Sequence, residues 1–88
     1  MKIKEGLILK EIAGNYIIVP LSGSLVDLNA MINVNETGAF LFKELESETT
    51  KEKLVDMMTK EYEIDKETAG SDIEDFLDVL RKNSMLDE

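Results

Sequence analysis

The chain has 88 residues, enough for one compact domain and too few for two. Its 43% hydrophobic and 33% charged residues are typical of a soluble globular protein. It contains no cysteine and no histidine, which excludes thiolate nucleophiles, disulfides, imidazole acid–base catalysis and zinc sites of the usual ligand types. We therefore expect a protein that is not an enzyme and that holds no metal or cofactor.

The net charge is −9, and nearly all of it lies in residues 45–88. Such a charge repels nucleic-acid phosphates and anionic membrane surfaces. No apolar run approaches the length of a membrane span, and the N-terminus lacks the pattern of a signal peptide. We therefore expect a cytoplasmic protein that binds neither nucleic acid nor membrane.

Two strands joined by a tight turn are predicted near the N-terminus. Residues 7–12 and 16–19 are rich in β-branched and aromatic side chains, and residues 13–15 between them tolerate positive φ. This pattern indicates a hairpin. Pro20 cannot donate to a strand ladder, so the second strand should end there or lie at a sheet edge.

A third strand is predicted at residues 30–34. Ala30, Ile32 and Val34 alternate with two further residues and should face the core. The strand carries no proline, lysine or inward charge of the kind that blocks a sheet edge, so its backbone should remain available for pairing. The order in which the three strands pair is left open.

From Asn35 onward the hydrophobic period changes from two to about 3.6, which indicates helices. Asn35 is a favourable N-cap for a first helix over residues 36–45. Thr49 and Glu52 form a possible capping box for a second, short helix that reaches Tyr62.

A third and longest helix is predicted to begin after Asp65 as N-cap and to run to about Asn83. Met85 and Leu86 beyond it should pack back as a hydrophobic anchor. The apolar side chains of this helix recur at helical spacing and should form its core stripe: Ala69, Ile73, Phe76, Leu77 and Leu80.

Three strands followed by three helices make an α+β pattern, compatible with a winged helix-turn-helix and with a single domain over residues 1–88. In a DNA-binding protein of this class the last helix would enter the major groove. Here that helix presents acids that would repel phosphate: Glu67, Asp72, Glu74, Asp75 and Asp78.

A motif with known counterparts runs from the third strand into the first helix: Val34-Asn35-Glu36-Thr37-Gly38-Ala39, followed by Leu41, Phe42 and Leu45. It resembles the L-N-x-T-G-A…I-W…L segment of the coenzyme PQQ synthesis protein D (PqqD) family. The resemblance continues in register through residues 50–54, residues 62–65 and the last helix, so that it covers about residues 7–86.

The chain departs from this family pattern at two positions. Phe42 stands where many members have tryptophan, and Asn83 with Ser84 stands where the family often has a glycine. Both positions look architectural, since asparagine can take the left-handed conformation at a helix C-terminus almost as glycine does.

The resemblance implies a peptide-binding module, also called a RiPP recognition element. Members of the family bind the leader segment of a ribosomally synthesised precursor peptide and deliver it to a modifying enzyme, often a radical S-adenosylmethionine (SAM) enzyme. The leader adds as an antiparallel strand beside the third strand, and its side chains enter the groove toward the third helix. The implied mechanism is β-augmentation.

The residues expected to bind the peptide lie on two elements. On the last helix, Val79 lies clear of the core stripe, next to Phe76 and on the flank of Asp72, as a groove wall requires. Asp72 and Asp75 could pair with lysine or arginine of a leader. The full set of expected peptide-binding residues is Ala30, Met31, Ile32, Asn33, Val34, Asp72, Asp75, Phe76 and Val79.

Plainer interpretations stand beside this one. Apolar residues of the set are typical of a core, the acids are typical of a solvated face, and Asn35 and Thr37 are expected only to cap the first helix. An alternative function is an acidic winged-helix adaptor that binds a protein partner through its last helix. An open edge strand can also pair with a second copy, so both a monomer and a weak homodimer are compatible with the sequence.

Overall fold

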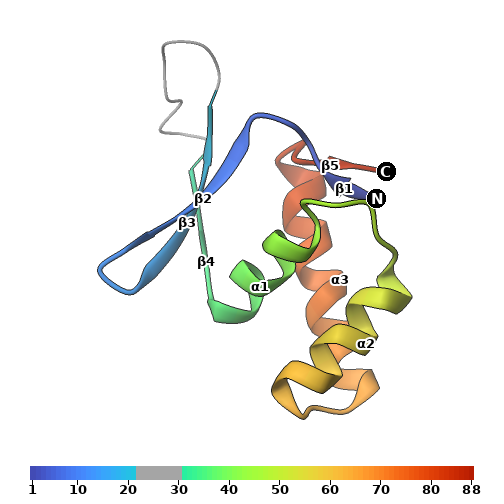
Figure 1. The fold of residues 1–88 in the computed structure, drawn as a ribbon. Coiled ribbons are helices and arrows are strands. Elements are labelled where there is room, and N and C mark those ends of the chain that lie inside the picture. The colour runs from blue at the N-terminus through green and yellow to red at the C-terminus, as the bar shows by residue number, and fades with distance from the viewer. Residues whose placement is uncertain (22–30) are drawn as a thin grey trace.

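A three-stranded antiparallel sheet comes first in the chain and three helices follow it (Figure 1). The structure is a computed structural model that describes residues 1–21 and 31–88. Strands β2 (Leu7–Ile12), β3 (Asn15–Pro20) and β4 (Ile32–Val34) pair in the order β2-β3-β4. The predicted α+β class is confirmed. Ala30, the first residue of the predicted third strand, lies outside the described residues.

The hairpin of β2 and β3 closes through two residues with positive φ, Ala13 at 51° and Gly14 at 83°. Two such residues match the right-handed twist of the flanking strands. The register then pairs Ile12 with Asn15, so β3 begins one residue earlier than the sequence predicts.

Strand β4 pairs with β3 in the register Ile18 with Ile32 and Tyr16 with Val34. Ile32 and Val34 are partly buried against the core, whereas Asn33 between them is exposed. The predicted alternation of this strand is therefore confirmed.

Helix α1 (Glu36–Glu44) begins as predicted, because the Oδ1 atom of Asn35 accepts a hydrogen bond from the Gly38 N–H at 2.8 Å. Helix α3 (Lys66–Lys82) begins in the same way, with Asp65 accepting from the Thr68 N–H at 2.7 Å. Both caps satisfy backbone donors that a helix N-terminus leaves free.

The predicted capping box of the second helix is wrong by one residue. Helix α2 (Lys51–Tyr62) is capped by Thr50, whose Oγ1 accepts from the Lys53 N–H at 3.3 Å. Thr49 lies one residue before the cap: its N–H donates to the Met1 carbonyl at 3.0 Å, its carbonyl accepts from the Met1 amine, and its buried hydroxyl makes no hydrogen bond to the described residues.

At the end of α3 the left-handed conformation falls on the residue after Asn83. Asn83 has a φ of −103° and its side chain donates to the Val79 carbonyl, while Ser84 takes the left-handed conformation with a φ of 57°. The N–H of Met85 then reaches the Leu80 carbonyl at 2.8 Å. This is a Schellman motif, in which the left-handed residue stands one place beyond the C-cap.

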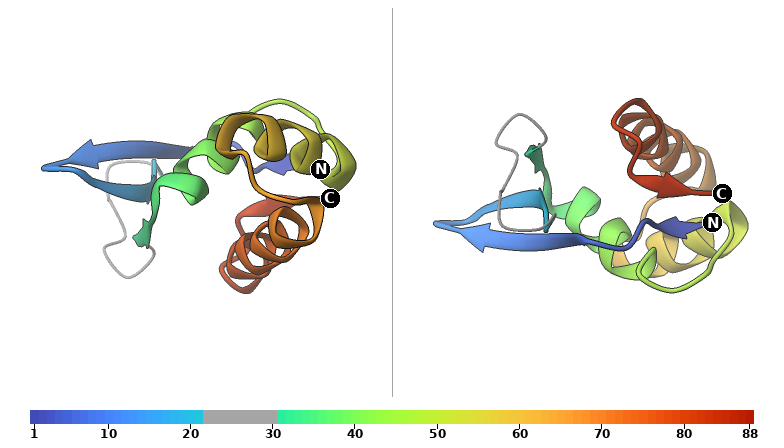
Figure 2. Two further views of the ribbon diagram at one scale, coloured as in Figure 1. Left: turned by 90° about the horizontal axis from the view of Figure 1, so that it is seen from below. Right: turned by 90° about the horizontal axis from the view of Figure 1, so that it is seen from above.

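Two short strands, β1 (Lys2–Ile3) and β5 (Leu86–Asp87), were not predicted. They pair antiparallel and bring the two ends of the chain side by side (Figures 1 and 2). Two residues each are too few for a periodic signal. The predicted anchor is confirmed, because Met85 and Leu86 are buried.

The core lies mainly among the three helices, while the β2–β3 hairpin extends away from them (Figure 2). None of the helices in residues 1–21 and 31–88 is long and apolar enough to cross a membrane. The largest fully buried side chains are Phe42, Ile18, Leu41, Leu45, Leu54, Met58, Ile73, Leu77 and Leu80.

Two neighbouring residues of α3 test this division between core and surface. Leu80 has no exposed surface and Val79 is 38% exposed. Replacing Leu80 with alanine leaves a cavity and should lower the free energy of unfolding by about 2–5 kcal/mol. The Val79→Ala change should alter it by less than about 0.5 kcal/mol. Urea unfolding of both variants measures the difference, and equal losses would contradict the assignment.

The cap of α3 predicts a pH dependence. The hydrogen bond from the Thr68 backbone lowers the pKa of Asp65 in the folded state. The ionised carboxylate therefore stabilises the fold above its unfolded pKa of about 3.9, and this stabilisation is lost as the pH falls through the folded pKa. The Asp65→Asn variant keeps a capping oxygen and cannot titrate. Its urea midpoint should fall less than that of the unaltered protein between about pH 5 and about pH 2. If the urea midpoints of the two proteins fell equally with pH, this prediction would be wrong.

Candidate peptide-binding site

Strand β4 forms one edge of the sheet. It pairs with β3 on one side, and in the described part of the chain no strand lies on its other side. Successive residues of an antiparallel strand direct their N–H and C=O groups to opposite sides. The backbone N–H and C=O groups of Asn33 therefore point to one side of β4, and those of Ile32 and Val34 point to the other. The outer edge consequently offers backbone donors and acceptors that no described strand pairs.

A groove of about 300 Å³ runs beside this edge, between β4, the start of α1 and the middle of α3. The residues that α3 contributes are spaced three, four and seven apart, so they share one face of the helix. The groove is lined by Asn33, Val34, Asn35, Thr37, Asp72, Asp75, Phe76 and Val79.

The structure brings together most of the residues that the sequence predicts for the site. Asn33 and Val34 from the strand line the groove with all four helix residues, Asp72, Asp75, Phe76 and Val79. Met31 and Ile32 precede them on the chain and lie outside the lining, and Ala30 is not described. Their roles in peptide binding stay predictions.

Gly38 lets three elements converge at the groove. A Cβ atom at this position would lie 3.0 Å from the Cβ of Val34 and 3.3 Å from the Cε1 of Phe76. Both distances are shorter than ordinary van der Waals contact. Glycine therefore allows β4 and α3 to approach the first turn of α1 together.

Asn35 and Thr37 do more than the sequence analysis assigned to them. The Asn35 Oδ1 atom accepts from the Gly38 N–H and from the Thr37 hydroxyl at 2.9 Å, and both side chains also line the groove. The same residues thus start α1 and form one wall of the groove. Their position directly between the open strand and the first helix is the signal that could have identified them.

The two halves of the groove differ in polarity. Phe76, 9% exposed, and the half-buried Val34 form an apolar base that the exposed Val79 extends. Asp72 and Asp75 are exposed at the other half. Neither has an ion-pair partner among residues 1–21 and 31–88, and the lining contains no lysine or arginine.

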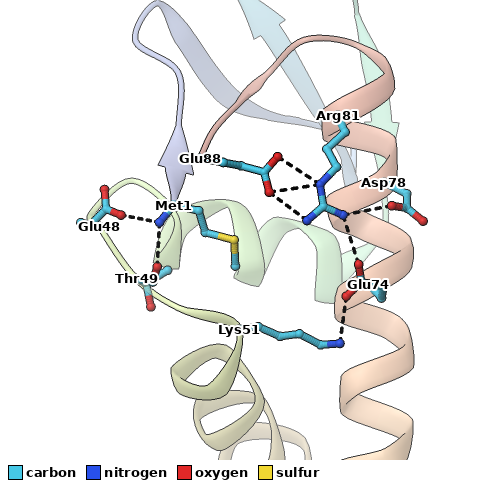
Figure 3. A network of polar contacts seen from close by, with 8 residues as sticks. All are labelled: Met1, Glu48, Thr49, Lys51, Glu74, Asp78, Arg81 and Glu88. Carbon is cyan, nitrogen blue, oxygen red and sulfur yellow. Dashed lines mark hydrogen bonds and ion pairs between the residues drawn. The ribbon is translucent and has the colours of Figure 1, made fainter.

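Other acids of α3 are compensated (Figure 3). Arg81 bonds Glu74 and Asp78 at 3.1 Å each and Glu88 at 3.0 Å, and Lys51 bonds Glu74 at 2.8 Å. Hydrogen bonds from Lys51 and then Arg81 lower the pKa of Glu74, and Arg81 lowers the pKa of Glu88. Among the acids of α3 from Asp72 onward, the two that face the groove are therefore the ones without an ion-pair partner in residues 1–21 and 31–88.

Two further hollows adjoin neither β4 nor Asp72. One of about 500 Å³ lies beside β1 and β2 with Phe42, and one of about 560 Å³ lies at the start of α2 with Lys66. Residues 1–21 and 31–88 contain no group of three or more side chains placed to hold a metal ion. The hollow beside β2 also adjoins an edge strand and apolar side chains, but it is lined by lysines from β1 and α1, whereas the groove beside β4 has acids and no lysine or arginine in its lining.

Comparisons with known proteins agree with this architecture. The structure of TbiB1 in complex with the TbiA(β) leader peptide matches with a TM-score of 0.74 at 24% identity, over 99% of this chain and 95% of that chain. At this identity the likeness shows the fold. No curated protein matches the chain. The family model described as Coenzyme PQQ synthesis protein D (PqqD) matches residues 15–86, a span that includes β4 and α3. The resemblance seen in the sequence is thereby confirmed: the chain belongs to the PqqD family.

Proposed function

We propose that this protein binds a leader peptide as an added strand on β4 and holds the peptide side chains in the groove against α3. The observation that carries the proposal is the continuity of the open β4 edge with that groove. Backbone hydrogen bonds to β4 would supply register, and the groove would supply specificity. The TbiB1 structure, which holds a leader peptide on a similar fold, supports it.

The peptide is presented to another protein rather than altered here. The chain contains no histidine or cysteine that could serve as a general base or nucleophile. Binding the leader would raise the local concentration of the attached core peptide at a modifying enzyme, as a tether does. Because members of the family often serve radical SAM enzymes, we propose an enzyme of that class, and we propose that the encounter takes place in the cytoplasm. Residues 1–88 would act as one recognition domain, since β1 and β5 join its two ends.

The proposal predicts where a leader peptide perturbs the protein. On titration of isotope-labelled protein with the leader of the precursor encoded beside it, the amide resonances of residues 31–34 and of residues 72–79 should shift. Strand β2 forms the opposite edge of the sheet, so the amides of Leu7–Ile12 serve as the internal control. Shifts centred on β2 or absent from β4 would contradict strand addition at this edge.

Proline substitutions distinguish the outer edge of β4 from its paired edge. Ile32→Pro and Asn33→Pro remove backbone donors that face opposite sides of the strand. The variant that loses a hydrogen bond between β4 and β3 should unfold at a lower urea concentration than the unaltered protein. The other should unfold cooperatively near the original midpoint, yet bind the leader at least about tenfold more weakly, because a strand hydrogen bond is lost and the proline ring obstructs pairing.

The adaptor alternative predicts a different result. If both proline variants bound the leader normally and the partner enzyme were lost only on charge reversal at Asp72 and Asp75, strand addition would be wrong. A concentration-dependent dimer that competes with the leader would show instead that the edge also pairs with a second copy.

A further inference from the structure

We infer that the groove selects a peptide strand with lysine or arginine two residues before an apolar side chain. The inference rests on the proposed function and specifies which peptides this chain takes. It is carried by the two-part groove lining, by the uncompensated carboxylates and by the opposite directions of β4 and α3.

The charge of the occupant follows from the ion pairs. Arg81 and Lys51 form ion pairs with acids elsewhere on α3, while Asp72 and Asp75 at the groove have no ion-pair partner among residues 1–21 and 31–88. An acidic peptide side chain placed there would add like charge next to two carboxylates. A basic side chain would form ion pairs that no described residue already makes.

The spacing follows from the geometry of a helix and a strand. The acidic half of the groove is centred between Asp72 and Asp75, and the apolar half between Phe76 and Val79. These centres are four residues apart, or about 6 Å along a helix. Alternate side chains of a strand, which point to the same face, are separated by about 7 Å. A peptide can therefore fill both halves with residues two apart.

The order follows from chain direction. Strand β4 runs down into α1 in Figure 1, whereas α3 runs upward from Lys66 to Lys82. The approach of Phe76 to position 38, next to Val34, places the middle of α3 beside the end of β4. A peptide antiparallel to β4 runs in the same direction as α3, so it passes Asp72 and Asp75 before Phe76 and Val79. The basic residue then precedes the apolar one; a parallel peptide would reverse the order.

Three synthetic twelve-residue peptides test the inference on the full chain. Each has blocked ends and a serine–threonine background, and they differ in one central cassette: Lys-Thr-Val, Val-Thr-Lys or Glu-Thr-Val. Dissociation constants are measured from amide shifts of labelled protein. At low salt the Lys-Thr-Val peptide should bind about tenfold more tightly than the Glu-Thr-Val peptide and also more tightly than the reversed cassette. The preference for lysine should shrink as salt screens the charges.

A pair of double variants assigns the preference to the groove. Asp72→Asn with Asp75→Asn should abolish the preference for Lys-Thr-Val over Glu-Thr-Val. Asp56→Asn with Glu67→Gln removes the same number of charges from exposed positions outside the groove lining and should retain it.

The outcomes separate this inference from the function on which it rests. Equal affinities with shifts at residues 31–34 would overturn the selectivity and leave strand addition standing. Tighter binding of Val-Thr-Lys would overturn the inferred order. No shift of the β4 amides by any of the three peptides at about 1 mM, while the leader still shifts them, would overturn the inference alone; no shift with the leader either would overturn both.

Discussion

The close approach of β4, α1 and α3 around Gly38 is the constraint on which the candidate site depends. Val34 and Phe76 can both lie against this position because it has no side chain, and the Asn35 cap fixes the direction in which α1 leaves the strand. The groove is the space left beside this contact. Of its apolar base, Phe76 belongs to the core that holds the helices together and Val34 packs against it. The candidate groove and the folded core therefore share side chains.

Charge is distributed over α3 by flank rather than uniformly. On one flank Arg81 joins Glu74, Asp78 and the C-terminal Glu88, which ties the helix to the segment of β5. On the other flank Asp72 and Asp75 face the groove without cations in the described residues. A net charge of −9 is thus not evenly available to a partner. Two of the carboxylates without an ion-pair partner in the described part of the chain, Asp72 and Asp75, lie where an added strand would place its side chains.

Periodicity predicted the elements well because the core stripes are strong. The stripe on α3 and the caps at Asn35 and Asp65 are confirmed, since each depends on neighbours within one turn. The errors depend on contacts distant in sequence. Backbone hydrogen bonds join Thr49 to Met1, and β1 and β5 exist only because they pair with each other. The shared helix face identified the four groove residues of α3, which are Asp72, Asp75, Phe76 and Val79. The role of Gly38 in letting β4 and α3 approach α1 could not be predicted, because it depends on how these elements pack together.

The pairing of β1 with β5 also determines how the module can be joined to other proteins. Both ends of the described chain lie together, on the far side of the helices from β4 (Figures 1 and 2). A linker attached at either end would leave the groove uncovered. The same domain is therefore geometrically suited to work as a separate subunit or fused to an enzyme. In the fused arrangement, the length and stiffness of the linker would set how often a bound peptide meets the catalytic centre.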